Sequence, residues 1–360
     1  MDSRVGNVGP VSIGRGATAT TGERHHALDL IRGLAALSVA QYHFMSWNNV
    51  AMIESMGTFA VYVFFILSGL TMTMVYGDRF ADGILPGAAR GFFRKRAARL
   101  LPLLIIVALL SGVKQALLGH TDIPAAILTG TGLMALHMPG FLSNSIGAWS
   151  LGIELAFYAV FPIVAMLSRT WKGVAVSGGI LLIAQHLMIY KIREMDPFWN
   201  YYISNLTFAP FFAIGVLISF DRRAQKSAMI PISLIGLAAI FGFSLVVSTN
   251  LMQDQASYLL LTVASALVIW AAWRSTLPAW LVPIGAFLGD ISYSLYLTHW
   301  IANDVARALH LPLKLEWGLF TVAALAGSYF CYRFFEAPMR ERLGASRGRA
   351  GRALEISTLP

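Results

Sequence analysis

Charged residues are scarce in this sequence. Of its 360 residues only 12% are Asp, Glu, Lys or Arg, whereas 57% are hydrophobic. A soluble domain carries about 25% charged residues. Half that share cannot cover a water-facing surface, which excludes an ordinary soluble enzyme and a disordered chain. The composition indicates an integral membrane protein with little of its mass outside the bilayer.

Cysteine is nearly absent as well, because Cys331 is the only one in the chain. An intramolecular disulfide or a cysteine-based zinc site is therefore impossible, and a disulfide-rich secreted domain is excluded. Several familiar catalytic patterns are also missing, among them the GxSxG elbow, the Walker loop and HExxH. We expect no metal in the site.

Ten segments are apolar over the length that a transmembrane helix needs, about 20 residues. They cover residues 28–47, 56–76, 100–118, 149–168, 173–190, 201–219, 229–248, 257–273, 281–302 and 316–335. We expect an all-α integral membrane protein, a bundle of about ten transmembrane helices. Residues 27–343 would form this single domain, between a disordered cytoplasmic tail at 1–26 and a basic cytoplasmic tail at 344–360. The longest connections, 77–99 and 119–148, leave no room for a folded soluble domain.

The distribution of Lys and Arg predicts the orientation. With the N-terminus inside, 21 of the 27 basic residues fall in cytoplasmic segments or, for Arg333, at the inner end of the last span; four fall in outer segments and two elsewhere within spans. Such a bias is typical of inner-facing loops and predicts that both termini are cytoplasmic. The net charge of +9 is therefore a topology signal rather than a sign of nucleic-acid binding.

The first span contains three ionisable residues, Asp29, Arg32 and His43. Charged groups inside a membrane are costly and are candidates for function by default. Arg32 and His43 are eleven residues apart, so they share a helix face with about 16 Å between them along the axis. Asp29 and Arg32 can pair as i, i+3 neighbours. The alternative is a structural Asp–Arg pair and a histidine bonded to a neighbouring helix.

The fourth span begins with Trp149, Ser150 and Glu154. Entered from the outside, it places Glu154 about 8 Å below its outer end, at the depth of His43. We expect the histidine to be the partner of this carboxylate. Ser150 shares the face of Glu154, and Trp149 is at the depth where interfacial aromatic residues gather.

Two further candidates lie on other segments. His299, near the outer end of the ninth span, would either bind an acceptor or close the end of the bundle. Segment 77–99 carries six basic residues, including Arg94, Arg96 and Arg99. They serve topology and contact with anionic lipids, or they hold the phosphates of a nucleotide-like ligand, for which arginine is the preferred donor.

Six stretches in order resemble one family, the integral-membrane acyltransferases called acyltransferase family 3. They are LDLIRGLAALSVAQYHF (28–44), FFILSGL (64–70), FFRKRAARLLP (92–102), WSLGIELAFYAVFP (149–162), LGDISYSLYLTHW (288–300) and FEAPMRERL (335–343). The resemblance covers about residues 28–343, which is nearly the whole chain. It departs from the family pattern at Leu30, where glycine is frequent, and at Trp300, where the residues after the histidine often include proline.

The resemblance implies roles for individual residues. The family's Arg-x10-His motif falls on Arg32 and His43, with His43 as the catalytic histidine. Its Arg-x-x-Arg motif falls on Arg96 and Arg99, which with Arg94 would hold an acyl-CoA donor, acetyl-CoA or a longer one. Its Trp-Ser-Leu-x-x-Glu motif places Glu154 as the group that orients His43. Substrate contacts would come from Trp149, Ser150, His299 and Asp29.

The function so implied is transfer of an acyl group, expected to be acetyl, from cytoplasmic acyl-CoA to a carbohydrate or lipid-linked glycan in a bacterial inner membrane. His43 would act as general base, with an acyl-histidine intermediate as the second choice. Competing interpretations are a proton-coupled transporter, which also uses intramembrane His and Glu, and a membrane sensor or assembly subunit. A transporter would often show two similar halves, and we find none in this sequence.

Overall fold

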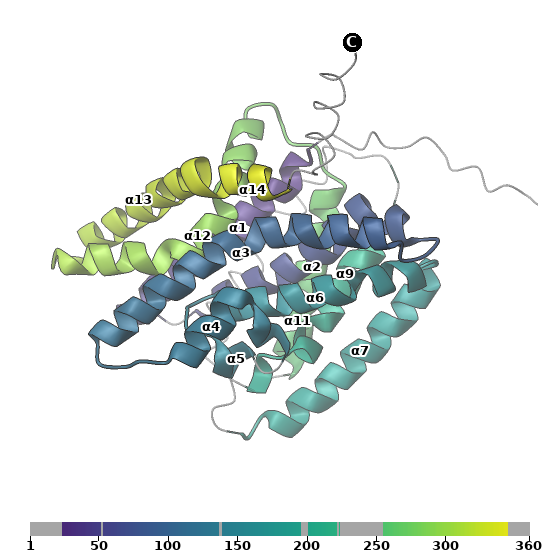
Figure 1. Ribbon diagram of the computed structural model, residues 1–360, viewed down its shortest axis with the longest axis horizontal. Coiled ribbons are helices and arrows are strands. Elements are labelled where there is room, and N and C mark those ends of the chain that lie inside the picture. Colours follow the sequence, from purple (N-terminus) through teal and green to yellow (C-terminus); the bar gives the residue numbers. More distant parts are fainter. Residues whose placement is uncertain are drawn as a thin grey trace, which may run out of the picture.

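The computed structural model describes residues 24–344, except for 52, 137–138, 196–200, 222 and 224–254. Within these residues the regular elements are all helices (Figure 1). They are α1 (His26–Trp47), α2 (Glu54–Phe80), α3 (Pro86–Leu117), α4 (Ile123–Thr131), a 3₁₀ turn (Leu133–Leu136), α5 (Pro139–Leu142), α6 (Ala148–Leu167), α7 (Trp171–Ile192), α9 (Asn205–Ile218), α11 (Gln255–Trp273), α12 (Val282–Ala308), α13 (Leu313–Cys331), a π-helical turn (Tyr332–Glu336) and α14 (Ala337–Gly344).

Nine of the ten predicted spans coincide with helices of the structure. The tenth, 229–248, lies outside the described residues. By length and composition, four helices among the described residues can cross a membrane: α2, α3, α6 and α7. The helical, membrane-type fold is thus confirmed. The number of ten spans and the cytoplasmic position of both termini stay predictions.

The segment 77–99 is not the loop that the sequence suggested. Helix α2 continues to Phe80, and α3 already begins at Pro86. Proline is favoured in the first turn of a helix, and the alanines, arginines and lysine that follow are good helix formers. At 32 residues, α3 is about 48 Å long, whereas the hydrocarbon core of a bilayer is about 30 Å thick. Its basic first turns therefore extend beyond the apolar part of the helix.

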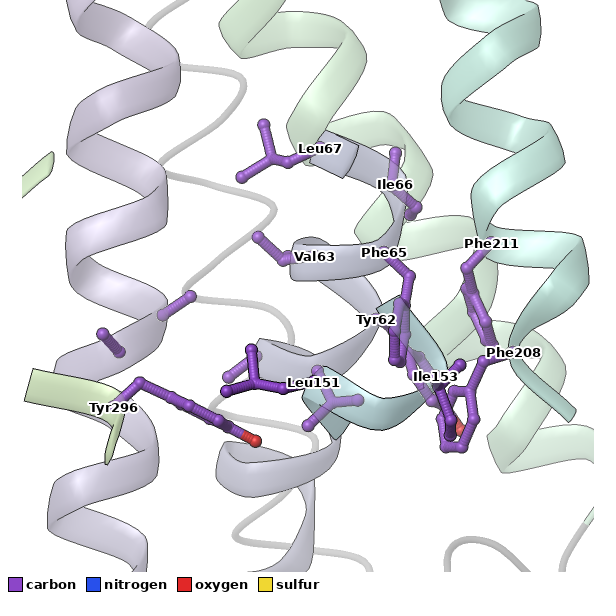
Figure 2. Packing of buried hydrophobic residues seen from close by; sticks show 14 of the residues in the cluster. Tyr62, Val63, Phe65, Ile66, Leu67, Leu151, Ile153, Phe208, Phe211 and Tyr296 are labelled. Carbon is purple, nitrogen blue, oxygen red and sulfur yellow. The ribbon is translucent and has the colours of Figure 1, made fainter. Parts of the chain in front are cut away.

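Small residues let the central helices approach closely. Gly69 of α2 faces the backbone of α9, because a Cβ there would lie 2.1 Å from the carbonyl oxygen of Phe212. Gly215 of α9 faces α2 in return, with a Cβ 2.0 Å from the carbonyl oxygen of Ile66. Close contact at small residues is the usual way in which membrane helices pack. Around this contact the buried aromatic rings of α2 and α9 interlock, with Tyr62 and Phe211 stacked at 3.9 Å (Figure 2).

The outer helices expose rows of large apolar side chains. Val176, Ile180, Ile183 and Leu187 repeat along one face of α7 and are each more than 60% exposed. Helix α7 lies at the edge of the bundle in Figure 1, where one of its faces contacts α9. An exposed apolar row of this length is unfavourable in water and suits the hydrocarbon of a membrane.

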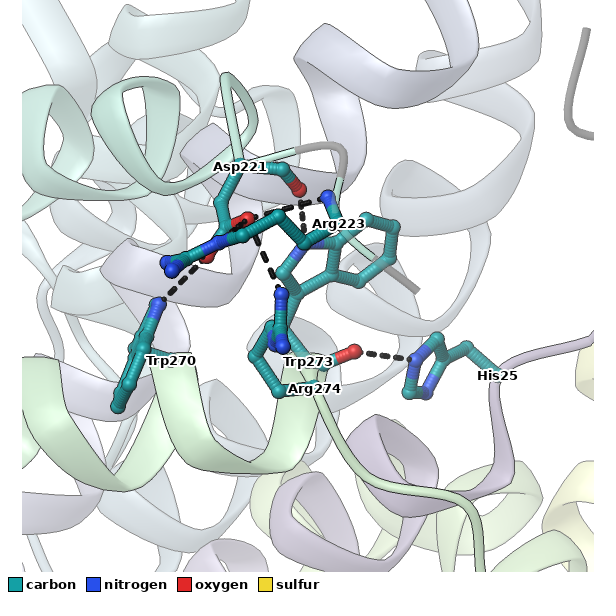
Figure 3. A network of polar contacts seen from close by, with 6 residues as sticks. All are labelled: His25, Asp221, Arg223, Trp270, Trp273 and Arg274. Atoms are coloured by element: carbon teal, nitrogen blue, oxygen red, sulfur yellow. Dashed lines mark hydrogen bonds and ion pairs between the residues drawn. The ribbon is translucent and has the colours of Figure 1, made fainter. Parts of the chain in front are cut away.

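A polar cluster joins the end of α9 to the end of α11 and to the start of α1 (Figure 3). The Asp221 carboxylate accepts hydrogen bonds from Arg223 at 2.7 and 2.8 Å and from Trp270 at 2.9 Å, and it pairs with Arg274 at 3.4 Å. Trp273 donates to the Asp221 carbonyl oxygen at 2.9 Å. The hydrogen bonds from Arg223 come first among the causes that hold the pKa of this carboxyl well below its usual range.

Candidate active site

Five helices surround a polar cavity inside the bundle. The cavity has a volume of about 70 Å³, which is room for a few water-sized groups. Its walls are Arg32 of α1; Phe64, Phe65, Leu67, Ser68 and Thr71 of α2; Arg96, Arg99 and Leu100 of α3; Ser150, Leu151, Glu154 and Tyr158 of α6; and Ser292, Tyr293 and Tyr296 of α12. Three of these side chains are cationic and one is an acid, so the cavity carries an excess of positive charge.

Glu154 is held on one side of its carboxylate. Ser68 donates to its Oε1 at 2.7 Å, and Tyr158 donates a short hydrogen bond to the same oxygen. Both donors, Ser68 and Tyr158, bond to Oε1, and neither of them bonds to the second carboxylate oxygen, Oε2. The expected partnership of Glu154 with His43 is not seen, since the carboxylate faces the cavity while His43 does not line it. Arg32, on the same face of α1 but about 16 Å from His43 along the axis, lines the cavity with Glu154. The predicted common depth of Glu154 and His43 is therefore wrong, because the offset of α6 along α1 places Glu154 at the level of Arg32.

Arg32 lies at the cavity wall and pairs with Asp29 at 3.1 Å, as the i, i+3 spacing predicted. The other oxygen of Asp29 accepts from Arg24 at 2.5 Å, and Arg24 continues the chain to Asp290 at 2.9 Å. Asp29 fits here because the next helix presents Gly289, where a Cβ would lie 2.5 Å from that of Asp29. Both oxygens of Asp29 are thus engaged by arginines, and Asp29 is not among the cavity residues. Its predicted contact with a substrate stays a prediction.

The arginines predicted to hold a donor divide into two groups. Arg96 and Arg99 line the cavity, whereas Arg94 points to the carbonyl oxygen of Gly344 at 3.4 Å, in contact with α14. Arg96 lies between two tyrosine rings, 4.7 Å above Tyr76 and 5.6 Å from Tyr158, and donates to the Tyr76 hydroxyl at 2.8 Å. Its Nε is buried and has no hydrogen-bond partner within the part of the chain that the structure describes. A buried donor of this kind is costly unless a ligand satisfies it.

The two predicted histidines meet each other. His43 Nδ1 and His299 Nε2 are 2.8 Å apart, and His299 Nδ1 is 2.9 Å from the carbonyl oxygen of Tyr296. Trp47 stacks on the His43 ring at 5.0 Å with an angle of 8° between the planes. His299 is fully buried and both of its nitrogens are engaged, so it is not placed to bind an acceptor directly.

Tyr296 contacts both the cavity and the histidine pair. Its hydroxyl forms a hydrogen bond of 2.8 Å with Ser150, and its ring lines the cavity on one side, while its backbone carbonyl accepts from His299 on the other. Ser150 is thus at the predicted site. Trp149 is not among the cavity residues, and its ring packs against Phe208 at 5.6 Å.

Sequence reasoning missed three residues of this site: Ser68, Tyr158 and Tyr296. Two signals were available. Ser68 stands in the FFILSGL stretch, next to the glycine that brings α2 against α9, and Tyr158 is the i+4 neighbour of Glu154 on the same helix face. Tyr296 gave no signal, because only the packing of α12 against α6 sets its hydroxyl beside Ser150. Among the described residues no group of three or more His, Cys, Asp or Glu side chains is arranged to hold a metal ion.

The helical, membrane-type bundle with its cationic cavity and neighbouring histidine pair identifies the class of this protein as a helical membrane protein. A comparison with known families then identifies its family. Residues 25–333 match the family described as "Acyltransferase domain", Acyl_transf_3, and this chain belongs to that family. The resemblance seen in the sequence is thereby confirmed.

Similar proteins occur in several bacteria. One is "Putative O-acetyltransferase SACOL0978" of Staphylococcus aureus, 25% identical over 87% of this chain; the match spans 57% of that relative, so this chain corresponds to little more than half of it. The exopolysaccharide production protein ExoZ of Rhizobium meliloti is 27% identical over 84% of this chain and 96% of its own length. Nodulation protein 10 of Rhizobium leguminosarum is 30% identical over 55% of this chain and 60% of its own length. No solved structure matches the chain.

Proposed function

We propose that this protein is a membrane O-acyltransferase that moves an acyl group, acetyl in the first instance, from acyl-CoA to a hydroxyl of a carbohydrate-type acceptor. The observation that carries the proposal is the cationic cavity lined by five helices, with the hydrogen-bonded pair of His43 and His299 beside it. The family supports acyl transfer, and the names of the relatives support acetyl as the group and an exopolysaccharide or another glycan as the acceptor.

The donor end of the reaction would use Arg96, Arg99 and Arg32. Acyl-CoA is anionic, and arginine binds phosphate with directed, charge-assisted hydrogen bonds. In the predicted orientation the basic first turns of α3 face the cytoplasm, where acyl-CoA is made. The phosphates would bind Arg96 and Arg99 while the thioester end of the pantetheine arm enters the cavity, and Glu154 would accept hydrogen bonds from the amides of that arm.

The chemical step would be carried by His43. Its Nε2 takes the proton of the acceptor hydroxyl, and the oxygen attacks the thioester carbonyl carbon. The new C–O bond forms as the C–S bond breaks, and the departing thiolate receives the proton from His43 to give CoA. A positioned general base contributes about 10²–10⁴-fold to the rate. The acyl carbon would reach His43 by way of Tyr296, which contacts Ser150 at the cavity wall with its hydroxyl and His299 with its carbonyl oxygen.

The setting that fits this reaction is a bacterial inner membrane, with membrane lipids around the exposed faces of α3 and α7 and a glycan, free or lipid-linked, reaching the outer end of α1. No nucleic acid enters the proposal.

The donor site is tested by thermal unfolding of the detergent-purified protein with CoA or acetyl-CoA. A ligand at about 100 times its dissociation constant stabilises a protein by about 2.7 kcal/mol. We expect a shift in the wild type and its loss in Arg96→Ala/Arg99→Ala. Lys95→Ala is the matched control, because Lys95 is an exposed cation on the same helix that does not line the cavity. If no acyl-CoA shifts the unfolding temperature, the proposed acyl-CoA donor is contradicted and a transporter is favoured. If Lys95→Ala loses the shift as fully as the double variant, binding at Arg96 and Arg99 is contradicted.

A further inference from the structure

The bond from His299 to the backbone of its own helix fixes the position of one proton. His299 Nδ1 lies 2.9 Å from the Tyr296 carbonyl oxygen and 3.3 Å from that of Leu295. A carbonyl oxygen can only accept, so Nδ1 must carry the hydrogen. In a neutral imidazole the other nitrogen is then an acceptor, and His299 Nε2 presents a lone pair.

That lone pair in turn fixes the proton on His43. His43 Nδ1 is 2.8 Å from His299 Nε2, and a hydrogen bond between them needs a hydrogen on His43 Nδ1. The lone pair of neutral His43 is therefore on Nε2. We propose that His299 is a positioning residue, which relays the polarity of the α12 backbone to His43 and holds it in the tautomer that can act as a base at Nε2. The catalytic consequence rests on the proposed function; the tautomer does not.

Neighbouring rings keep this arrangement in place. Trp47 stacks on His43 at 5.0 Å, which limits rotation of the ring, and the planes of His43 and His299 differ by only 4°. His299 is fully buried. Water therefore does not compete for its nitrogens, and the alternative tautomer of His43 would leave two lone pairs facing each other.

The pair also accommodates the charge that forms during the reaction. When His43 accepts a proton at Nε2, its Nδ1–H continues to donate to His299, so the new cation keeps a hydrogen-bond partner. A residue that orients the base and stabilises its protonated form is the third member in triad-type sites. Here a histidine anchored to a helix carbonyl takes the place that a carboxylate occupies elsewhere, without the cost of a further buried charge.

The first experiment is spectroscopic and needs no activity. The ring nitrogens of ¹⁵N-histidine-labelled wild-type protein are observed by NMR above the pH at which the pair is neutral, and His43 is assigned from the signals absent in His43→Gln. We expect His43 to carry hydrogen on Nδ1 and a bare Nε2. A hydrogen on Nε2 with a bare Nδ1 would overturn the proposal, even if the protein proves to be an acyltransferase.

The second experiment is kinetic. His299→Leu removes the acceptor of the His43 hydrogen bond, and we expect kcat to fall about 100-fold with KM for acetyl-CoA unchanged. His299→Gln offers an amide oxygen near the position of Nε2 and should restore much of the loss.

The control is His186→Leu, because His186 bonds to a helix carbonyl, that of Leu182 at 3.0 Å, on a helix away from the cavity. If His299→Leu retains the wild-type kcat, the positioning role of His299 is wrong. It is also wrong if His299→Gln and His299→Leu are equally impaired while both variants keep the NMR signature of His43. Loss of transfer in His43→Gln, together with the expected Nδ1–H signal of His43 in the wild type, supports both proposals, whereas an active His43→Gln refutes only the catalytic role.

Discussion

Ser68 on α2 and Glu154 on α6 are joined by a hydrogen bond of 2.7 Å at the wall of the cavity. The bond links two stretches that are 86 residues apart in the sequence. It also fixes the one acid among the cavity residues opposite three arginines. The small residue pair Ser68–Gly69 therefore has two uses: the glycine admits α9, and the serine orients the carboxylate.

Glu154→Gln should impair catalysis without unfolding the protein. The amide keeps the size of the side chain and an acceptor for Ser68, but it removes the negative charge that Glu154 contributes to the cavity wall. Because Glu154 is proposed to bind the amides of the pantetheine arm, we expect the affinity for the donor to fall about tenfold, since a hydrogen bond to a charged group is stronger than a neutral one by about 1 kcal/mol. The unfolding temperature should change little, and acyl-transfer kinetics and circular dichroism measure the two effects. Ser68→Ala, which loses one hydrogen bond, should lower the free energy of unfolding by about 1 kcal/mol and should reduce activity less than Glu154→Gln does. A Gln variant as active as wild type would remove Glu154 from the mechanism.

His43→Gln should separate donor binding from chemistry. His43 is eleven residues from Arg32, about 16 Å along α1, and does not line the cavity. We therefore expect transfer to be lost while the thermal shift produced by CoA stays at its wild-type value. Turnover by the purified variant would refute the catalytic assignment, and loss of the CoA shift would show that the two regions are not independent.

Gly215→Ala should destabilise the contact between α2 and α9. The added Cβ would lie 2.0 Å from a backbone oxygen, which cannot move without separating the helices. Overpacking of this kind costs about 1–3 kcal/mol, seen as a lower unfolding temperature. Gly179→Ala on α7 is the matched control, because nothing lies within 4 Å of its Cβ position and alanine favours the helix. Equal effects of the two substitutions would contradict close packing at Gly215.

The Asp221 cluster should make stability depend on pH in acid. The pKa of the folded Asp221 carboxyl is lowered, chiefly by the hydrogen bonds from Arg223, so its stabilising contribution is complete above the unfolded value of about 3.9 and is lost as the pH falls below it. Thermal unfolding between pH 7 and pH 3 should therefore show a steeper decline for wild type than for Asp221→Asn. At pH 7 the Asn variant should be less stable, since Arg274 is buried beside that carboxylate. Parallel curves for the two proteins would contradict the prediction.

The local properties of the chain were determined by the sequence alone. Runs of apolar residues specify helices because each helix satisfies its own backbone hydrogen bonds, and the fixed rise per residue set the distance from Arg32 to His43. The Asp29–Arg32 pair follows from the same geometry and is present at 3.1 Å. Motifs in family order pointed to the acyltransferase family, which the comparison confirmed.

The contacts between helices were decided only in the tertiary structure. Depth along each helix made Glu154 the expected partner of His43, but the partner is His299, and Glu154 turns to Ser68 and Tyr158. Arg94, which was predicted to bind the donor with Arg96 and Arg99, contacts Gly344 instead and does not line the cavity. A sequence gives the position of a residue along its own helix. The offset of that helix against its neighbours, its rotation and the choice of those neighbours depend on how all the helices pack together, with small residues such as Gly69 and Gly215 setting where they come closest.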